Sequence, residues 1–407
     1  MKKLNLLIAA LAVLAFASCS NDEVVNNAQD KVAQQSIGFS PLTKRATRAN
    51  IVNKAADLKD FAVTAYASQP LVSSATAKYF IAGVEKTLNL TTGDIYTYDG
   101  SGMENIKIVY RDGGWDYNSS ADTKYWPYLQ DGSTYKSDGL KLDFVAISPA
   151  SVVNDGFTFS NTGGSIANYV VGDDDLCHAY TQGAEQKNGQ VQLNFKHLLS
   201  QIKFAAKKAT GMTVDIKDIT LANVPNQGSL NPIAGTSSWT VAATSTKASY
   251  KGNSGVFSVV AAGDAADADT ITAAGTEILV LPQDASLSTY DPATITATNT
   301  VSSTGKLYLK VSCRVKVAGS TTWAIGGDSG EYKDIYFCLK SDWQPGVKYT
   351  YTLLFGGVKD PNGGGEGSED ETGGGTDDTG ETTPPTTPIT FSASVTDWTD
   401  ATKDIAF

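Results

Sequence analysis

Short runs in which apolar and polar residues alternate strictly constrain this chain more than any other feature. The clearest runs are residues 61–66, 140–146 and 191–196. Successive side chains of a β-strand point to opposite faces of a sheet, so a period of two predicts strands with one buried and one solvated face. Turn-forming Gly, Asn, Asp and Pro residues separate the runs about every ten residues. The chain is therefore predicted to be all-β.

These runs fall into two stretches, separated by the polar, Gly-bearing residues 183–189. We expect two tandem β-sandwich domains, at residues 36–185 and 186–355, each of ordinary size for that architecture. Residues 198–208 fit either a short helix or a strand that continues after a bulge. The second domain closes on a Pro345-Gly346 turn that starts a further strand.

The first residues have the pattern of a signal peptide, predicted to span 1–19. Lys2 and Lys3 precede an apolar stretch that is too short for a comfortable membrane span, and small residues precede Cys19. This ending resembles the lipobox of bacterial lipoproteins, in which the cysteine is acylated and becomes the new N-terminus, although Phe16 departs from the usual aliphatic residue. The alternative is an ordinary cleaved signal in which Cys19 is incidental. Residues 20–35 are polar and are expected to be a tether.

Composition changes sharply at the other end of the chain. Residues 356–388 are rich in Gly, acidic residues, Thr and Pro, and are expected to be a flexible linker. Beyond it, the segment 389–407 opens with a strictly alternating strand whose apolar face is Ile389, Phe391, Ala393 and Val395. An isolated strand neither pairs its backbone nor covers its apolar face.

This strand could therefore fold back on its own body or pair with a neighbouring molecule. A linker of this kind spans roughly 30 Å, which permits both. Burial of the large apolar side chains would contribute about 5–8 kcal/mol before entropy costs. Pairing with another molecule would be β-strand addition.

Charge and length exclude some classes of partner. The 407 residues carry a formal net charge of −11, whereas proteins that bind nucleic acids usually present a basic face to phosphates, so no nucleic-acid partner is expected. No segment after the signal peptide is long and apolar enough to cross a bilayer.

Candidate catalytic and metal residues are few. Cys177 and His178 are neighbours, so on a strand they point to opposite faces and cannot act directly as nucleophile and base. His197 is interpreted as structural, and residues 173–175, all Asp, as a solvated acidic turn rather than a Ca²⁺ site. Trp115 and the aromatic pair 125–126 are interpreted as buried rather than sugar-stacking. We expect no catalytic site, no metal and no cofactor, and leave open whether any disulfide forms.

In their order along the chain, several segments together resemble the fimbrillin family, the subunits of type V pili. They are residues 19–23, 36–40, 47–49, 61–66, 125–127, 143–149, 191–200 and 343–351. The resemblance implies transthyretin-like sandwich domains, export as an outer-membrane lipoprotein precursor, and assembly into a surface fimbria that supports adhesion. The implied partners are other copies of the chain, other fimbrial subunits and a trypsin-like surface protease.

The same resemblance implies maturation by cleavage after an arginine, here Arg45 or Arg48, with loss of the strand that carries Ile37 and Phe39. A strand of another subunit then fills the groove that is opened. The lost strand and the C-terminal strand share the pattern Ile-x-Phe-Ser, at residues 37–40 and 389–392. This suggests that the tail of one subunit, the donor strand, replaces the removed strand of the next.

Two other functions remain open on the sequence. One is a surface glycan-binding lipoprotein of a nutrient-uptake system, which would need exposed coplanar aromatics and no proteolytic maturation. The other is a tip or accessory subunit of the pilus rather than the repeating stalk; the strand-like tail favours the stalk.

Overall fold

The computed structural model describes the chain in segments. They are residues 35–42, 55–131, 134–231, 239–241, 246–253, 255–263, 265, 267–273, 276–283, 291–296, 298–339 and 342–356, together with the backbone of 389–397. Strands dominate this part of the chain, and its helical elements are short 3₁₀ turns, as the prediction of an all-β chain requires. None of its helices is long and apolar enough to span a membrane. The 3₁₀ turns are η1 (Ala55–Leu58), η2 (Ser120–Asp122), η3 (Ala150–Asn154), η4 (Gln186–Asn188), η6 (Pro292–Thr294) and η7 (Ser302–Thr304).

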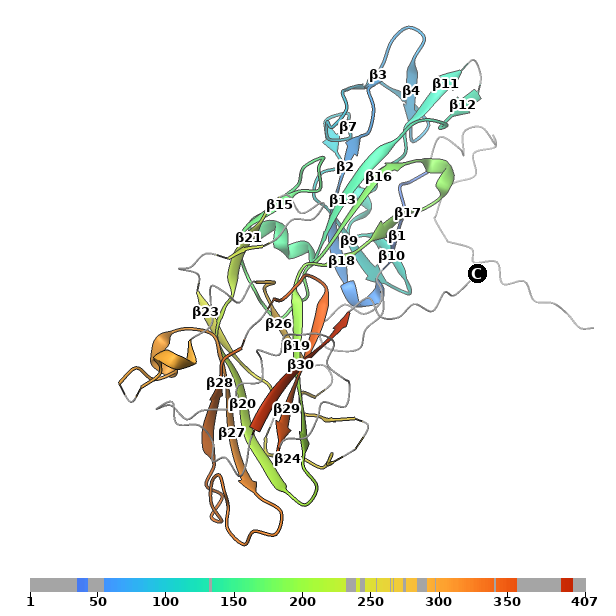
Figure 1. Ribbon diagram of the computed structural model, residues 1–407. Coiled ribbons are helices and arrows are strands. Elements are labelled where there is room, and N and C mark those ends of the chain that lie inside the picture. The colour runs from blue at the N-terminus through green and yellow to red at the C-terminus, as the bar shows by residue number, and fades with distance from the viewer. Residues whose placement is uncertain are drawn as a thin grey trace, which may run out of the picture.

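A six-stranded antiparallel sheet organises the N-terminal half (Figure 1). In order across the sheet, its strands are β10 (Gly114–Tyr117), β9 (Ile106–Arg111), β2 (Asp60–Ala67), β13 (Leu142–Ser148), β16 (Cys177–Ala184) and β18 (Lys196–His197). Next to it, β1 (Phe39–Leu42) pairs in parallel with β17 (Val191–Asn194). Smaller sheets complete this half: β12 (Thr134–Lys136), β11 (Tyr128–Asp131), β4 (Lys78–Ile81) and β5 (Val84–Lys86); β3 (Leu71–Val72) with β6 (Asn89–Leu90); β7 (Thr97–Tyr98) with β8 (Ser101–Gly102).

Two five-stranded sheets make up the C-terminal half, at the opposite end of the elongated molecule (Figure 1). The first contains β25 (Asp269–Thr270), β19 (Ser200–Lys208), β29 (Val347–Phe355) and β30 (Ile389–Asp397), with β26 (Ile278–Val280) on β19. The second contains β23 (Lys247–Lys251), β20 (Thr213–Pro225), β27 (Tyr308–Lys316) and β28 (Lys333–Phe337), with β24 (Phe257–Ser258) on β20. A four-stranded sheet lies between the halves: β14 (Phe157–Thr158), β15 (Ser165–Val170), β21 (Gln227–Leu230) and β22 (Thr240–Val241).

Three main hydrophobic clusters hold these sheets together. One collects apolar residues between positions 37 and 195, and a second collects residues between 202 and 355, from both C-terminal sheets. A third contains residues of both halves, from Ala62 to Leu281. The two halves thus share part of their packing.

The third cluster corrects one expectation. The solvated face predicted for residues 61–66 is buried, because Ala62 and Tyr66 of β2 pack into the third cluster while Phe61 and Val63 pack into the first. The central strand β13 is buried on both faces in the same way. The edge strand β17 keeps the predicted alternation of buried and exposed residues. Within residues 198–208, Ser200–Lys208 form the strand β19 rather than a helix, and they pair with β29 in parallel through Ile202 and Phe204.

Candidate functional site

The candidate site is the position of the first described segment, residues 35–42. Its backbone is hydrogen-bonded on both sides: the Ile37 amide donates to the Lys124 carbonyl at 2.7 Å, and the Val191 amide donates to the Gly38 carbonyl at 2.9 Å. Trp126 donates its amide to the Gln35 carbonyl at 3.2 Å. The segment is therefore inserted between two parts of the chain that come later in the sequence.

Two of its large apolar side chains, Ile37 and Phe39, lie in the core of the N-terminal half. Ile37 is 0% exposed and Phe39 is 3% exposed. Because the residues are two apart on an extended segment, both point inward. The Phe39 ring packs edge-on against Phe61 and Phe144, each at 5.9 Å between centroids, and against Tyr117 at 6.3 Å.

Tyr117 also holds the backbone of the segment. Its hydroxyl donates to the Ile37 carbonyl at 2.9 Å. Burial raises the pKa of Tyr117 well above the ordinary value, so the hydroxyl keeps its proton and remains a donor. We call Phe61, Tyr117, Phe144 and Val191 the first-strand site.

The structure places the predicted residues unevenly. Ile37 and Phe39, predicted as the displaced strand, lie together in the first-strand site. Cys19, Arg45 and Arg48 lie outside the described residues. The strand itself begins later than residue 36: β1 spans Phe39–Leu42, and Ser36 makes an isolated bridge to Tyr125 on the other side of the segment.

The predicted donor strand is β30, and it pairs with β29 of the same chain in antiparallel fashion (Figure 1). The nine-residue register runs from Phe355 opposite Ile389 to Val347 opposite Asp397. The predicted donor residues follow this register: Phe391 lies opposite Leu353, Ala393 opposite Tyr351 and Val395 opposite Tyr349. β30 is the last strand of its sheet, so β29 is its partner within the described residues. Of the two possibilities, the chain as described folds back on its own body.

The structure brings together a second group of side chains, Asp175, Cys177 and His197. The sequence did not reveal this group, because the prediction compared Cys177 only with its neighbour His178. The Nδ1 atom of His197 lies 2.7 Å from Oδ2 of Asp175 and 3.5 Å from Sγ of Cys177. Asp175 and Cys177 are buried, and the side chain of His197 is 9% exposed. The solvated-turn interpretation therefore holds for Asp173 and Asp174, which are exposed, and is wrong for Asp175.

Cys177, His197 and Asp175 differ from a nucleophile relay in one respect. In a relay, one ring nitrogen takes the nucleophile's proton while the other donates to the carboxylate. Here the thiol and the carboxylate meet the same ring nitrogen. Burial, followed by the charge of Asp175, raises the pKa of the Cys177 thiol well above its ordinary value, which opposes formation of the reactive thiolate.

The remaining candidates have structural contacts. His178 is buried and donates from Nε2 to the Gly163 carbonyl at 2.6 Å. Trp126 is 1% exposed, and the half-buried Trp115 packs against Phe61 at 5.1 Å. These two indoles are not coplanar exposed platforms of the kind that stacks on sugars.

Comparison with known proteins identifies the family of this chain. The family model described as Fimbrillin-like matches residues 47–398. A fimbrial protein from Bacteroides vulgatus is 14% identical, with a TM-score of 0.49 and coverage of 89% of this chain and 99% of that one. A candidate cell adhesion protein from Bacteroides uniformis is 16% identical, with a TM-score of 0.37 and coverage of 89% and 99%. No curated protein matches the chain. Because the family model covers most of its length, the chain belongs to the fimbrillin-like family.

Proposed function

We propose that this protein is a structural subunit of a cell-surface fimbria that assembles by strand exchange and supports adhesion. It is made as an outer-membrane lipoprotein acylated at Cys19, cleaved after Arg45 or Arg48 by a trypsin-like protease, and then joined to other copies of itself and to other fimbrial subunits. It is not an enzyme. The observation that carries this proposal is the burial of Ile37 and Phe39 in a segment that precedes both arginines.

Cleavage after either arginine separates this segment from the chain that holds it. Each fully buried Ile or Phe side chain contributes about 1.5–3 kcal/mol, so loss of the segment uncovers an apolar surface whose reburial is worth roughly 3–6 kcal/mol. The amide of Val191 and the carbonyl of Lys124 also lose their partners. A matured subunit therefore has a strong preference for a replacement strand.

The tail of another copy matches the vacated position. A strand that enters in the direction of β1, which runs parallel to β17, places Ile389 where Ile37 was and Phe391 where Phe39 was. Thr390 then takes the position of Gly38. A Cβ atom at Gly38 would lie 3.3 Å from Cγ of Gln190, an exposed side chain that can turn away. This register is thus sterically accessible.

Transfer of the tail requires β30 to leave β29 first. The nine-residue ladder to β29 is an edge pairing, so it opens without disturbing the other strands of its sheet. In the acceptor, the strand re-forms the shorter pairing that β1 makes with β17 over Phe39–Leu42, together with the hydrogen bonds to Lys124 and Val191. The apolar burial at the first-strand site then favours the joined state.

Limited trypsin treatment of the purified precursor tests the proposal. Polymers that appear as a ladder on a gel after cleavage, and that are absent from the Lys44→Ala/Arg45→Ala/Arg48→Ala variant, are expected; Lys44 is included because trypsin also cuts after lysine. Phe391→Asp should abolish the ladder, because it would place a charge in the first-strand site. Ser392→Asp, which alters the opposite face of the same strand, should retain it. Equal ladders from both aspartate variants would reject tail donation, and a cleaved protein that stays monomeric would reject strand exchange.

A further inference from the structure

Asp175, Cys177 and His197 are brought to one face of the sheet by strand geometry alone. Asp175 and Cys177 are two apart on an extended segment that leads into β16, so their side chains share a face. Cys177 lies directly opposite His197 in the antiparallel pair of β16 and β18. Directly opposed residues also share a face, with Cβ atoms about 5 Å apart. A carboxylate, a thiol and an imidazole therefore converge.

We propose that these three side chains form a site for a zinc-class divalent cation. Their candidate ligand atoms all lie within 4.8 Å of one another. Oxygen, nitrogen and sulfur from Asp, His and Cys are the protein ligands that Zn²⁺ takes, at about 2.0–2.3 Å in tetrahedral geometry. Bond lengths of that size place a nitrogen and a sulfur ligand about 3.5 Å apart, which is the 3.5 Å between Nδ1 of His197 and Sγ of Cys177.

Only the carboxylate needs to adjust. Oδ2 of Asp175 lies 2.7 Å from Nδ1 of His197, a hydrogen-bond distance, and two ligands of one tetrahedral ion are separated by about 3.3 Å. A small rotation of the Asp175 side chain supplies the difference. Binding releases the thiol proton to solvent as the sulfur–metal bond forms, and the neutral imidazole binds through Nδ1 while it carries its proton on Nε2.

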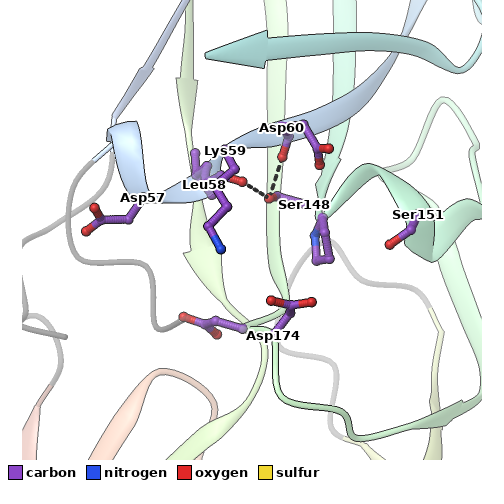
Figure 2. Close-up of a pocket in the computed structure, with 9 residues that line it drawn as sticks. Asp57, Leu58, Lys59, Asp60, Ser148, Ser151 and Asp174 are labelled. Carbon is purple, nitrogen blue, oxygen red and sulfur yellow. Dashed lines mark hydrogen bonds between the residues drawn. The ribbon is translucent and has the colours of Figure 1, made fainter. Parts of the chain in front are cut away.

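A pocket gives the ion a route and a fourth ligand. Asp175 lines a pocket of about 230 Å³ together with Asp57, Asp60, Asp174 and Ser148. Figure 2 shows the carboxylates of Asp57, Asp60 and Asp174 around the pocket, with Ser148 hydrogen-bonded to the backbone of Leu58 and Asp60. Among the described residues that line the pocket, the carboxylates outnumber the one cation, Lys59, and this negative charge attracts a divalent ion. The space admits a water molecule as the fourth ligand. Three protein ligands and one water complete a tetrahedral site.

The site also lies where the two halves meet. The amide of Leu198, next to His197, donates to the carbonyl of Leu176 at 2.8 Å, and the amide of Gly346 donates to the carbonyl of Leu199 at 2.8 Å. An ion that holds β16 and β18 together therefore also stabilises residues 198–199, which follow β18 and are hydrogen-bonded to Gly346 in the turn before β29. This role is independent of strand exchange.

Metal content and cobalt spectroscopy of the full chain test the site, with Zn²⁺ and Co²⁺ as the probes. After equilibration with Zn²⁺ and dialysis, one equivalent should remain bound. Co²⁺ should give a thiolate-to-metal charge-transfer band. Cys177→Ser should abolish that band, and His197→Asn should weaken binding by roughly tenfold or more.

The chain offers matched controls. Cys313→Ser alters another fully buried cysteine, and His178→Gln alters the other histidine; both should retain the band and the full equivalent of metal. Absence of stoichiometric metal, or a band that survives Cys177→Ser, would overturn the proposal. If Cys177→Ser does not fold, X-ray absorption of the zinc-loaded native chain decides. One sulfur at about 2.3 Å supports the site, and a shell of oxygens alone rejects it.

Discussion

Replacement of Phe39 by alanine probes the first-strand site most sharply. The side chain is 3% exposed and contacts three aromatic rings edge-on. Buried Phe→Ala changes cost about 3–5 kcal/mol, because apolar burial is lost and a cavity remains. The surrounding side chains belong to a six-stranded sheet and cannot collapse fully into the space. We therefore expect a loss of about 4 kcal/mol for Phe39→Ala in the precursor.

Urea unfolding of the precursor, followed by intrinsic fluorescence, measures this loss. Trp126 lies 6.0 Å from Phe144, a member of the first-strand site, and reports on its unfolding. Ser40→Ala, on the half-buried face of the same segment, is the control and should change stability by no more than about 0.5 kcal/mol.

Trypsin cleavage then provides a second comparison for the same variant. Once the front segment, which contains residues 35–42, has been cleaved and removed, the native and Phe39→Ala proteins are chemically identical and must unfold alike. A loss below about 1 kcal/mol in the precursor would refute the packing argument. A difference that persists in the cleaved proteins would show that the front segment is retained.

Three further changes test other parts of the account. Tyr117→Phe removes the donor to the Ile37 carbonyl and should destabilise the precursor by about 1–2 kcal/mol in the same urea assay. Burial lowers the pKa of His178 from 6.5 to about 4, so this side chain takes up a proton more readily in the unfolded chain than in the folded one. The free energy of unfolding should therefore be unaffected by this group above pH 6.5 and should fall by about 3 kcal/mol as the pH drops toward 4. His178→Gln should remove this loss in urea titrations across that range. Gly326→Ala should lower the melting temperature more than Gly113→Ala. Both glycines have positive φ, but of the two only Gly326 lies so close to a backbone carbonyl, that of Glu331, that an added Cβ atom would overlap it.

The fold class was predictable from the sequence because alternation is a local signal. At β17 the predicted pattern and the observed burial agree residue by residue, since this strand has solvent on one face. At β2 the prediction of a wet face failed. Ala62 and Tyr66 face a cluster that includes residues as distant as Leu281, and nothing local to β2 shows that this cluster will cover it.

The Asp175, Cys177 and His197 group was missed for a related reason. The pair Asp-x-Cys at 175–177 is visible in the sequence and places two ligands on one face of a strand. The third member comes from the register of β16 with β18, which places Cys177 opposite a residue 20 positions away. Comparison of Cys177 with its sequence neighbour could not reveal that register.

The two ends of the chain were predictable to different degrees. The alternation of Ile37 and Phe39 predicts the first strand, but its start is predicted too early, at residue 36. Ser36 bridges to Tyr125 on one side of the segment, whereas pairing with β17 on the other side begins at Phe39. The alternation predicts that the tail is a strand, but it does not show whether that strand pairs with its own chain or with a neighbouring molecule. Pairing with β29 decides this for the single chain.

Mass spectrometry of the subunits in isolated filaments tests the central claim most directly. Removal of the front strand predicts subunits that begin at Ala46 or Ala49 and lack the peptide that contains Ile37 and Phe39. Filaments built from subunits that still carry that peptide would contradict the account.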